Sequence, residues 1–182
     1  MLIFALSCGT HRVLLVHPAP ATSQHEPPGY EDGHVTRVVD GDTIEVIIED
    51  KAEGPGSGGT EPGITYSVRL IGIDTPESVA PHSRVECFGR EASQAADALL
   101  AGARVRLVKD VEDTDRFGRL LRYVYLRDEM ANARLVLNGY AAAYAYPPDT
   151  RHSEMFEMLE EAARADSRGM WGACGQEEVS ST

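Results

Sequence analysis

The chain has 182 residues, of which 42% are hydrophobic and 25% are charged, and its formal net charge is −12. This length suits one globular domain, and the excess of acids argues against a protein that coats nucleic acid through a broad basic surface. Nine of the 17 lysines and arginines lie between Arg84 and Arg127, so the acidic chain can still carry an arginine-rich face.

Residues 1–33 are interpreted as a leader or linker. A short apolar stretch without a preceding basic residue leads into a segment rich in Pro, His and Ser, which fits a disordered leader and a signal sequence equally well. The letters ALSC resemble a lipoprotein cleavage box, in which Cys8 would carry a lipid anchor. No apolar run reaches the roughly 18 residues that a membrane-spanning helix needs, so we expect no transmembrane segment.

The domain is expected to begin at residue 34 with strands. Alternating apolar and polar residues predict two strands within residues 34–50, on either side of Asp40-Gly41-Asp42. The Gly- and Pro-rich segment 49–63 predicts a long hairpin loop without apolar anchors, which we expect to be mobile and to contribute little to stability. Residues 64–73 then resume the strand pattern.

Helices and strands are mixed in the second half of the chain. Helical spacing of apolar residues predicts helices at 89–102, 131–139 and 152–169, and alternation predicts strands at 103–110 and 119–128. About five strands closed by helices fit an α+β domain built on a small barrel of the oligonucleotide/oligosaccharide-binding type. This domain is expected to span residues 34–175, followed by a disordered tail at 176–182.

Two acidic motifs follow strands. Asp40-Gly41-Asp42 is by itself a common hairpin turn. Asp74-Thr75-Pro76-Glu77 places two carboxylates and a hydroxyl in a turn that Pro76 makes rigid, and clustered oxygens of this kind suit calcium. A helix cap and turn explains the second motif equally well.

Two arginines accompany these acids. Arg69 lies inside a predicted strand and Arg119 at the entrance of another. Arginines in strands are usually edge or solvent-face residues, but paired guanidinium donors also match two phosphate oxygens.

Six ordered segments extend the pattern to nearly the whole predicted domain. VVDGDTIEV, VRLIGIDTPES, ECFGREAS, DTDRFGRLLRYVY, NGYAAAYAY and RGMWG follow one another within residues 34–174. In order and spacing they resemble the staphylococcal nuclease family. The resemblance implies a five-stranded barrel with three helices and a calcium-dependent phosphodiesterase. It would act on DNA and RNA, preferably single-stranded or open, and leave 3′-phosphate products.

The resemblance also implies roles for individual residues. By motif position, the calcium ligands would be the carboxylates of Asp42 and Asp74 and the carbonyl of Thr75, with Asp40 supporting them from behind. Glu77 would act as general base or orient the attacking water. Arg69 and Arg119 would bind phosphate, and Tyr144 and Phe117 would line the nucleotide pocket. Phe117 stands where well-known members carry a tyrosine, so a hydroxyl that could bond a terminal phosphate is missing.

Three cysteines allow at most one internal disulfide. In the fold that the resemblance implies, the segments of Cys87 and Cys174 can approach each other, so we expect these two to pair. The alternative is that both are small buried thiols. A disulfide favours a secreted or cell-envelope location, and we expect a monomer.

Two other functions compete with a nuclease. A noncatalytic nuclease-like module would bind nucleic acid or protein through the same barrel, but degenerate modules of this kind lose the acids and arginines that this chain retains. A single-strand-binding barrel would need a basic groove with exposed aromatic residues, and only 7% of the residues are aromatic.

Overall fold

A computed structural model describes residues 26–78 and 86–174. Five strands build its barrel, namely β1 (Tyr30–Val38), β2 (Thr43–Ala52), β3 (Thr65–Leu70), β5 (Arg104–Val108) and β6 (Leu120–Leu126). Antiparallel pairing gives the order β3-β2-β1-β5-β6, and the parallel pairing of β3 with β6 closes the barrel. The short strand β7 (Glu129–Met130) extends β6 into a hairpin. The predicted α+β barrel is confirmed.

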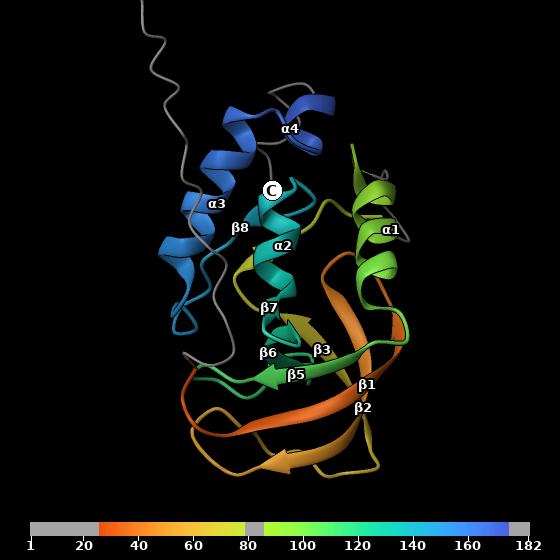
Figure 1. Cartoon of the computed structure of the whole chain (residues 1–182), viewed down its shortest axis with the longest axis vertical. Coiled ribbons are helices and arrows are strands. Elements are labelled where there is room, and N and C mark those ends of the chain that lie inside the picture. Colours follow the sequence, from red (N-terminus) through yellow and green to blue (C-terminus); the bar gives the residue numbers. More distant parts are fainter. Residues whose placement is uncertain (1–25, 79–85, 175–182) are drawn as a thin grey trace, which may run out of the picture.

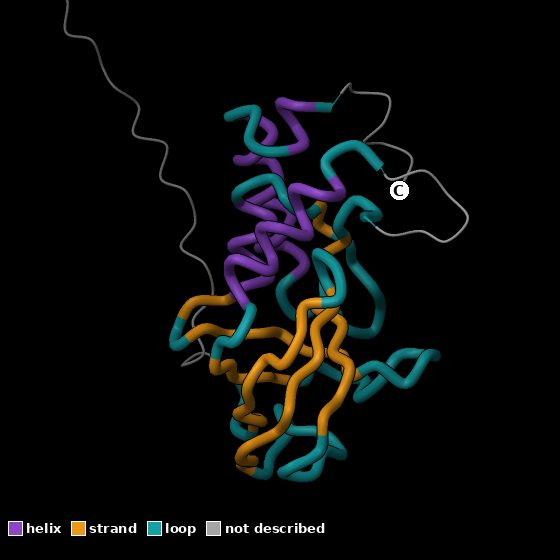
Figure 2. The backbone as a smooth tube through the Cα atoms, turned by 90° about the vertical axis from the view of Figure 1, so that its right-hand side faces the viewer, coloured by secondary structure: helices purple, strands orange, loops and turns teal. Residues whose placement is uncertain are grey.

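The helices gather at one end of the barrel (Figures 1 and 2). They are α1 (Gly89–Leu100), α2 (Ala131–Leu137), α3 (Ser153–Ala165) and the one-turn α4 (Met170–Ala173). Helix α3 buries Phe156, Leu159 and Ala163, which are three or four residues apart and therefore share one face. The same spacing explains how α1 buries small residues against the core.

The strand predicted at residues 64–73 is interrupted, which corrects the sequence-based expectation. Gly72 has φ 78°, and a Cβ at this position would lie 2.3 Å from the ring of Phe156. A left-handed bend that only glycine fits therefore ends β3. The chain continues as β4 (Ile73–Asp74), which pairs with β8 (Ala142–Ala143) in a separate two-stranded sheet. This bend carries Asp74 out of the barrel wall.

The first strand begins earlier in the sequence than the strand pattern indicated. Strand β1 begins at Tyr30, so the boundary expected between residues 33 and 34 lies within it. The Glu26 carboxylate accepts hydrogen bonds from Tyr125 and Arg151 and contacts the His152 ring. Cys8 and the tail at 176–182 lie outside the described residues, as does most of the predicted leader.

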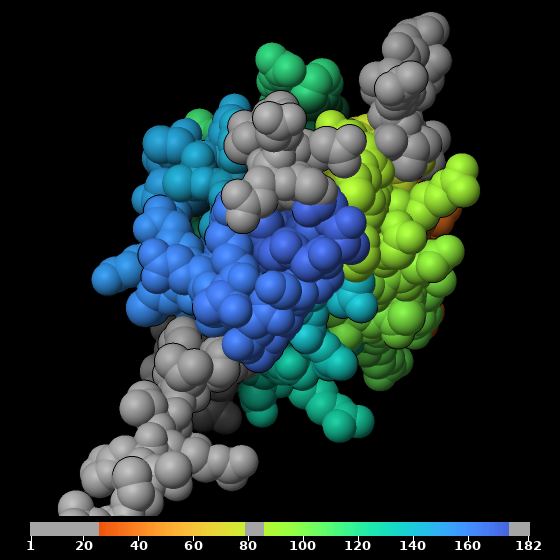
Figure 3. All heavy atoms as spheres, turned by 90° about the horizontal axis from the view of Figure 1, so that it is seen from above, coloured from red at the N-terminus to blue at the C-terminus, as the bar shows by residue number. Residues whose placement is uncertain are grey.

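The disulfide between Cys87 and Cys174 is present, with a Cα–Cα distance of 6.0 Å. It joins the segment before α1 to the end of α4, and Figure 3 shows the C-terminal helices beside α1. The predicted pairing is confirmed. The alternative, in which both cysteines are free thiols, is wrong. Among the described residues, no helix is long and apolar enough to cross a membrane.

The loop between β2 and β3 differs from the expectation of an unanchored segment. The buried Glu31 carboxylate accepts a hydrogen bond from the Gly58 N–H at 2.6 Å and from the Thr60 hydroxyl at 3.3 Å. The Gly59 N–H donates to Asp113 at 2.9 Å. The loop is therefore anchored by polar contacts, although it has no apolar anchors, and its contribution to stability stays a prediction. Its glycines allow the backbone to approach the carboxylates of Glu31 and Asp113.

Replacing residues 53–62 by an Asn-Gly turn should therefore lower the free energy of unfolding by at least about 2 kcal/mol, because hydrogen bonds to a buried carboxylate are lost. Urea denaturation would measure the change. Gly58→Ala and Gly59→Ala form a matched pair, since a Cβ would lie 1.9 Å from Asp113 Oδ1 at the first position and 3.2 Å from Oδ2 at the second. Gly58→Ala should destabilise more, and equal stabilities of all these variants and the parent would contradict the anchoring.

Candidate active site

A cavity of about 470 Å³ lies beside the bend at Gly72. Five of the predicted site residues line it, and they come from different parts of the chain: Arg69, Asp74, Phe117, Arg119 and Tyr144. The other predicted residues do not line the cavity. Asp42 is joined to the cavity through its ion pair with Arg69, and Thr75 donates to Asp42. Glu77 comes three residues after Asp74 in the chain.

Arg69 bridges the two predicted calcium carboxylates. Its Nη1 lies 2.8 Å from Asp42 Oδ2, and its Nη2 lies 2.8 Å from Asp74 Oδ1. Asp42 Oδ2 also accepts hydrogen bonds from the N–H and the hydroxyl of Thr75, at 3.1 and 3.2 Å. The structure therefore brings Asp42, Asp74, Thr75 and Arg69 into one network.

The electrostatics of this network show an excess of negative charge. Burial, together with the charges of Asp40 and Asp74, raises the pKa of Asp42 to about 6 against the opposing effect of Arg69. Burial likewise raises the pKa of Asp74, which Arg69 opposes and the charges of Glu86 and Glu77 reinforce. One guanidinium thus leaves these carboxylates undercompensated, and an additional cation would stabilise them.

The turn before β2 orients Asp42. Asp40 Oδ1 accepts a hydrogen bond from the Asp42 N–H at 3.1 Å. A Cβ on Gly41 would lie 2.6 Å from Thr75 Oγ1, so glycine allows the turn to pack against the Asp74-Thr75 segment. Asp40-Gly41-Asp42 therefore reverses the chain, holds the Asp42 backbone and packs against Thr75.

The turn before β6 holds Arg119. Asp115 Oδ1 accepts hydrogen bonds from the N–H groups of Phe117 and Arg119, both at 2.9 Å, and Asp115 Oδ2 lies 2.7 Å from Arg119 Nε. Burial alone would raise the pKa of Asp115, but these hydrogen bonds hold it below its ordinary value. Arg119 Nη1 also reaches Thr43 Oγ1 at 3.4 Å, next to Asp42.

Exposed aromatic side chains surround the cavity. Phe117 is 69% exposed, Tyr144 is 48% exposed and Tyr146 is 47% exposed, although large apolar rings are usually buried. The Arg119 guanidinium lies 5.5 Å from the centre of the Phe117 ring. Flat exposed rings beside arginines suit stacking on a base whose phosphate the arginines bind.

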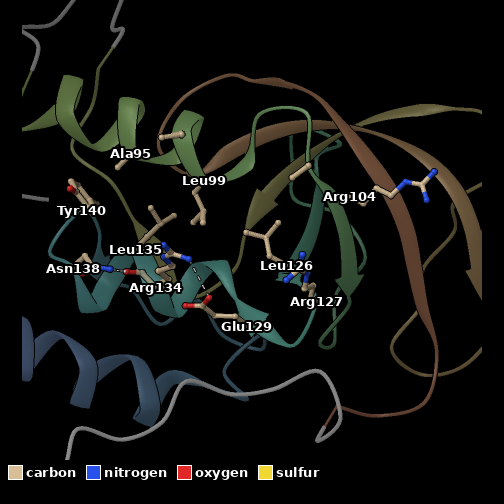
Figure 4. Close-up of a pocket in the computed structure, with 12 residues that line it drawn as sticks. Ala95, Leu99, Arg104, Leu126, Arg127, Glu129, Arg134, Leu135, Asn138 and Tyr140 are labelled. Carbon is tan, nitrogen blue, oxygen red and sulfur yellow. Dashed lines mark hydrogen bonds and ion pairs between the residues drawn. The ribbon is translucent and has the colours of Figure 1, made fainter.

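A larger hollow of about 900 Å³ lies between α1, α2 and the β6–β7 hairpin (Figure 4). Ala95 and Leu99 of α1 face Leu135 of α2 across it, and Arg134 pairs with Glu129 at 3.2 Å. Its described lining includes none of the predicted site residues. Size therefore does not decide the choice of active site, whereas the convergence of acids and arginines does.

Some residues of the site were missed by sequence reasoning. Asp115 begins a turn that ends at Gly118, and this turn signal could have indicated its role. Glu86, whose carboxylate accepts a hydrogen bond from the Glu77 N–H at 2.9 Å, comes from a position nine residues later and had no local signal. Tyr146 lines the cavity as Tyr144 does.

The fold and the site together define a small oligonucleotide-binding-type barrel with acids and arginines gathered at one cavity. The sequence profile described as "Staphylococcal nuclease homologue" matches residues 67–173. The chain belongs to the staphylococcal nuclease family.

Curated relatives agree with this assignment. The chain is 39% identical over 137 residues to a thermonuclease of Staphylococcus intermedius, an alignment that covers 75% of this chain and 74% of the relative. It is 36% identical over 137 residues to a thermonuclease of Staphylococcus hyicus, covering 75% and 73%. Endonuclease YncB of Bacillus subtilis is 33% identical over 141 residues, covering 76% and 61%. These relatives support a nuclease function.

Proposed function

We propose that the protein is a calcium-dependent phosphodiesterase that hydrolyses DNA and RNA, preferably in single-stranded or open regions. The observation that carries this proposal is the convergence of Arg69, Asp74 and Arg119 on one cavity beside the buried Asp42. Attack on phosphorus would break the bond to the 5′ oxygen and leave 3′-phosphate products. The thermonuclease relatives support the same reaction class.

The donor set suits calcium. Asp42, Asp74 and the Thr75 carbonyl offer hard oxygen ligands, and their carboxylates carry excess negative charge in a buried setting. Among the described residues, no three acidic, His or Cys side chains cluster tightly enough to hold a metal by themselves. Carbonyl oxygens and water would therefore complete the coordination. Bound calcium would reduce the charge on the scissile phosphate and orient it.

The chain's own residues would perform the other steps. Arg69 and Arg119 would donate hydrogen bonds to phosphate oxygens and stabilise the extra negative charge of the five-coordinate transition state. Glu77 would take a proton from the attacking water. Phe117 and Tyr144 would stack on the nucleotide, and the absence of a hydroxyl at Phe117 predicts weaker binding of a terminal phosphate.

Cleavage should require calcium. We expect hydrolysis of single-stranded DNA to stop in excess chelator and to return when calcium is restored. Asp42→Asn should raise the calcium concentration needed for half-maximal activity by tenfold or more, on the order of 1.4 kcal/mol or more in binding, because a charged ligand is lost. Unchanged cleavage in chelator, or an unchanged calcium requirement in Asp42→Asn, would contradict the proposal.

We also propose that the protein works outside the cytoplasm. The Cys87–Cys174 disulfide supports this location, because such bonds persist mainly in oxidising compartments. Fractionation of the producing cells with an antibody against the protein would test it, and recovery only from the cytoplasm would refute it.

A further inference from the structure

Two separate stretches of backbone meet next to the predicted general base. The Glu77 N–H donates to Glu86 Oε2 at 2.9 Å, and the Glu77 carbonyl accepts a hydrogen bond from the Glu86 N–H at 3.0 Å. Both backbone polar groups of Glu77 are therefore held by one residue. Glu77 and Glu86 are both exposed, so these two hydrogen bonds contribute to the geometry where burial does not.

The start of α1 packs directly against the same point. A Cβ on Gly89 would lie 2.4 Å from the Glu77 carbonyl oxygen and 3.1 Å from that of Pro76. The Gly89 N–H also donates to the Glu86 carbonyl at 3.1 Å, which closes a turn over residues 86–89. This turn is therefore shaped to accept the Glu77 backbone.

The disulfide ties this turn to the far end of the chain. Cys87, the neighbour of Glu86, is bonded to Cys174 at the end of α4. Helix α4 is itself anchored, because the Met170 N–H donates to the Gly139 carbonyl at 2.9 Å after α2. The next residue in the turn, Phe88, stacks on Tyr140 with 5.8 Å between ring centres. A covalent bond and an aromatic contact thus also hold the turn that contacts Glu77.

We propose that Glu86 is a positioning residue for Glu77 and that the Cys87–Cys174 disulfide holds Glu86 in the conformation that does this. The inference rests on the proposed role of Glu77 as general base. A base must be placed closely against the attacking water, and a misplacement of about 1 Å can cost about a hundredfold in rate. A disulfide far from the reacting atoms thereby acts on turnover.

The test compares the steady-state kinetics of cleavage of a DNA oligonucleotide by three variants: Glu86→Ala, Glu86→Gln and Glu91→Ala. We expect Glu86→Ala to lower kcat at least about tenfold and to shift KM and the calcium midpoint no more than Glu86→Gln does, because both variants remove the charge near Asp74 and only the alanine removes the acceptor of the Glu77 N–H. Glu86→Gln keeps an oxygen that can accept the Glu77 N–H and should retain most activity. Glu91, an exposed acid in the first turn of α1, is the matched control and should be neutral.

A double-mutant cycle separates this inference from the proposed function. In a Glu77→Ala background, Glu86→Ala should have no further effect on kcat, because the base that it positions is gone. Near-normal turnover of Glu77→Ala would overturn the role of Glu77 itself. An impaired Glu77→Ala with an unimpaired Glu86→Ala would overturn only the positioning role. A loss of calcium affinity in Glu86→Ala as large as that in Asp42→Asn would also overturn it, since Glu86 would then act on the metal.

A readout independent of activity completes the test. Hydrogen exchange of the Glu77 amide should become faster in Glu86→Ala, in which its acceptor is absent. It should also become faster in Cys87→Ser/Cys174→Ser, which should show a lower kcat at temperatures where it remains folded. Unchanged exchange and unchanged kcat in the double serine variant would remove the disulfide from the proposal.

Discussion

Glu77→Gln is expected to lower kcat by about two to four orders of magnitude, the range over which general base catalysis contributes. Glutamine has nearly the same shape as glutamate but cannot accept a proton from water at neutral pH. The substitution also leaves the backbone hydrogen bonds to Glu86 in place. The loss should therefore come from the chemical step and not from a displaced turn.

The measurement is kcat from steady-state cleavage with saturating calcium. KM should change little, because an interaction made mainly in the transition state lowers kcat and kcat/KM together. Thermal stability should also be preserved, since Glu77 is exposed. Glu91→Gln provides the same change of charge on an exposed acid of α1 and should be nearly silent. A Glu77→Gln variant with kcat within tenfold of the parent would exclude Glu77 as the base.

Local patterns predicted most of the secondary structure for physical reasons that the structure makes clear. Strand β2 buries alternate residues from Ile44 to Ile48, so its period of two was visible in the sequence. Helix α3 shows the corresponding helical period. The barrel could be predicted because the buried face of each element is determined by the spacing of apolar residues within that element.

The misses arise where a long-range contact decides the outcome. Gly72 ends β3 because the ring of Phe156, distant in the sequence, occupies the space of a side chain. The loop around Gly58 is anchored by Glu31, and Glu86 reaches Glu77 across the intervening loop. No local pattern contains such information. The motifs of the predicted site could be found from ordered segments, whereas the residues that contact them from distant positions, such as Glu86, could not.

The most buried ion pair of the described barrel, between Arg122 and Glu31, likewise depends on a long-range contact. Arg122 lies in the middle of β6 with 0% of its side chain exposed, and Glu31 of β1 is equally buried. Arg122 Nε and Nη2 donate to the Glu31 carboxylate, both at 3.0 Å. Nη2 also donates to Asp113 Oδ1 at 2.7 Å, and Nη1 donates to the Asp113 carbonyl at 3.0 Å. Burial alone would raise the pKa of Asp113, but hydrogen bonds from Gly59 and Arg122 lower it.

Arg122→Met should lower the free energy of unfolding by about 3 to 5 kcal/mol, because it leaves the Glu31 carboxylate buried without its cation. Urea denaturation monitored by the fluorescence of Trp171 would measure this loss. Arg104→Met on β5 is the matched control, because its partner Glu49 is 3.5 Å away and the Arg104 side chain is 81% exposed. That change should cost less than about 1 kcal/mol.

The double variant Glu31→Gln/Arg122→Met distinguishes charge from packing as the cause. Glutamine can still accept the hydrogen bonds of Gly58 and Thr60, but it brings no unpaired charge into the core. If the stranded carboxylate causes the loss, the double variant should be more stable than Arg122→Met alone, although a second substitution has been added. If the double variant is less stable than Arg122→Met, the loss comes instead from the missing contacts of the guanidinium with Asp113. That outcome would make the turn leading to Arg119, rather than the core of the barrel, the part that Arg122 stabilises.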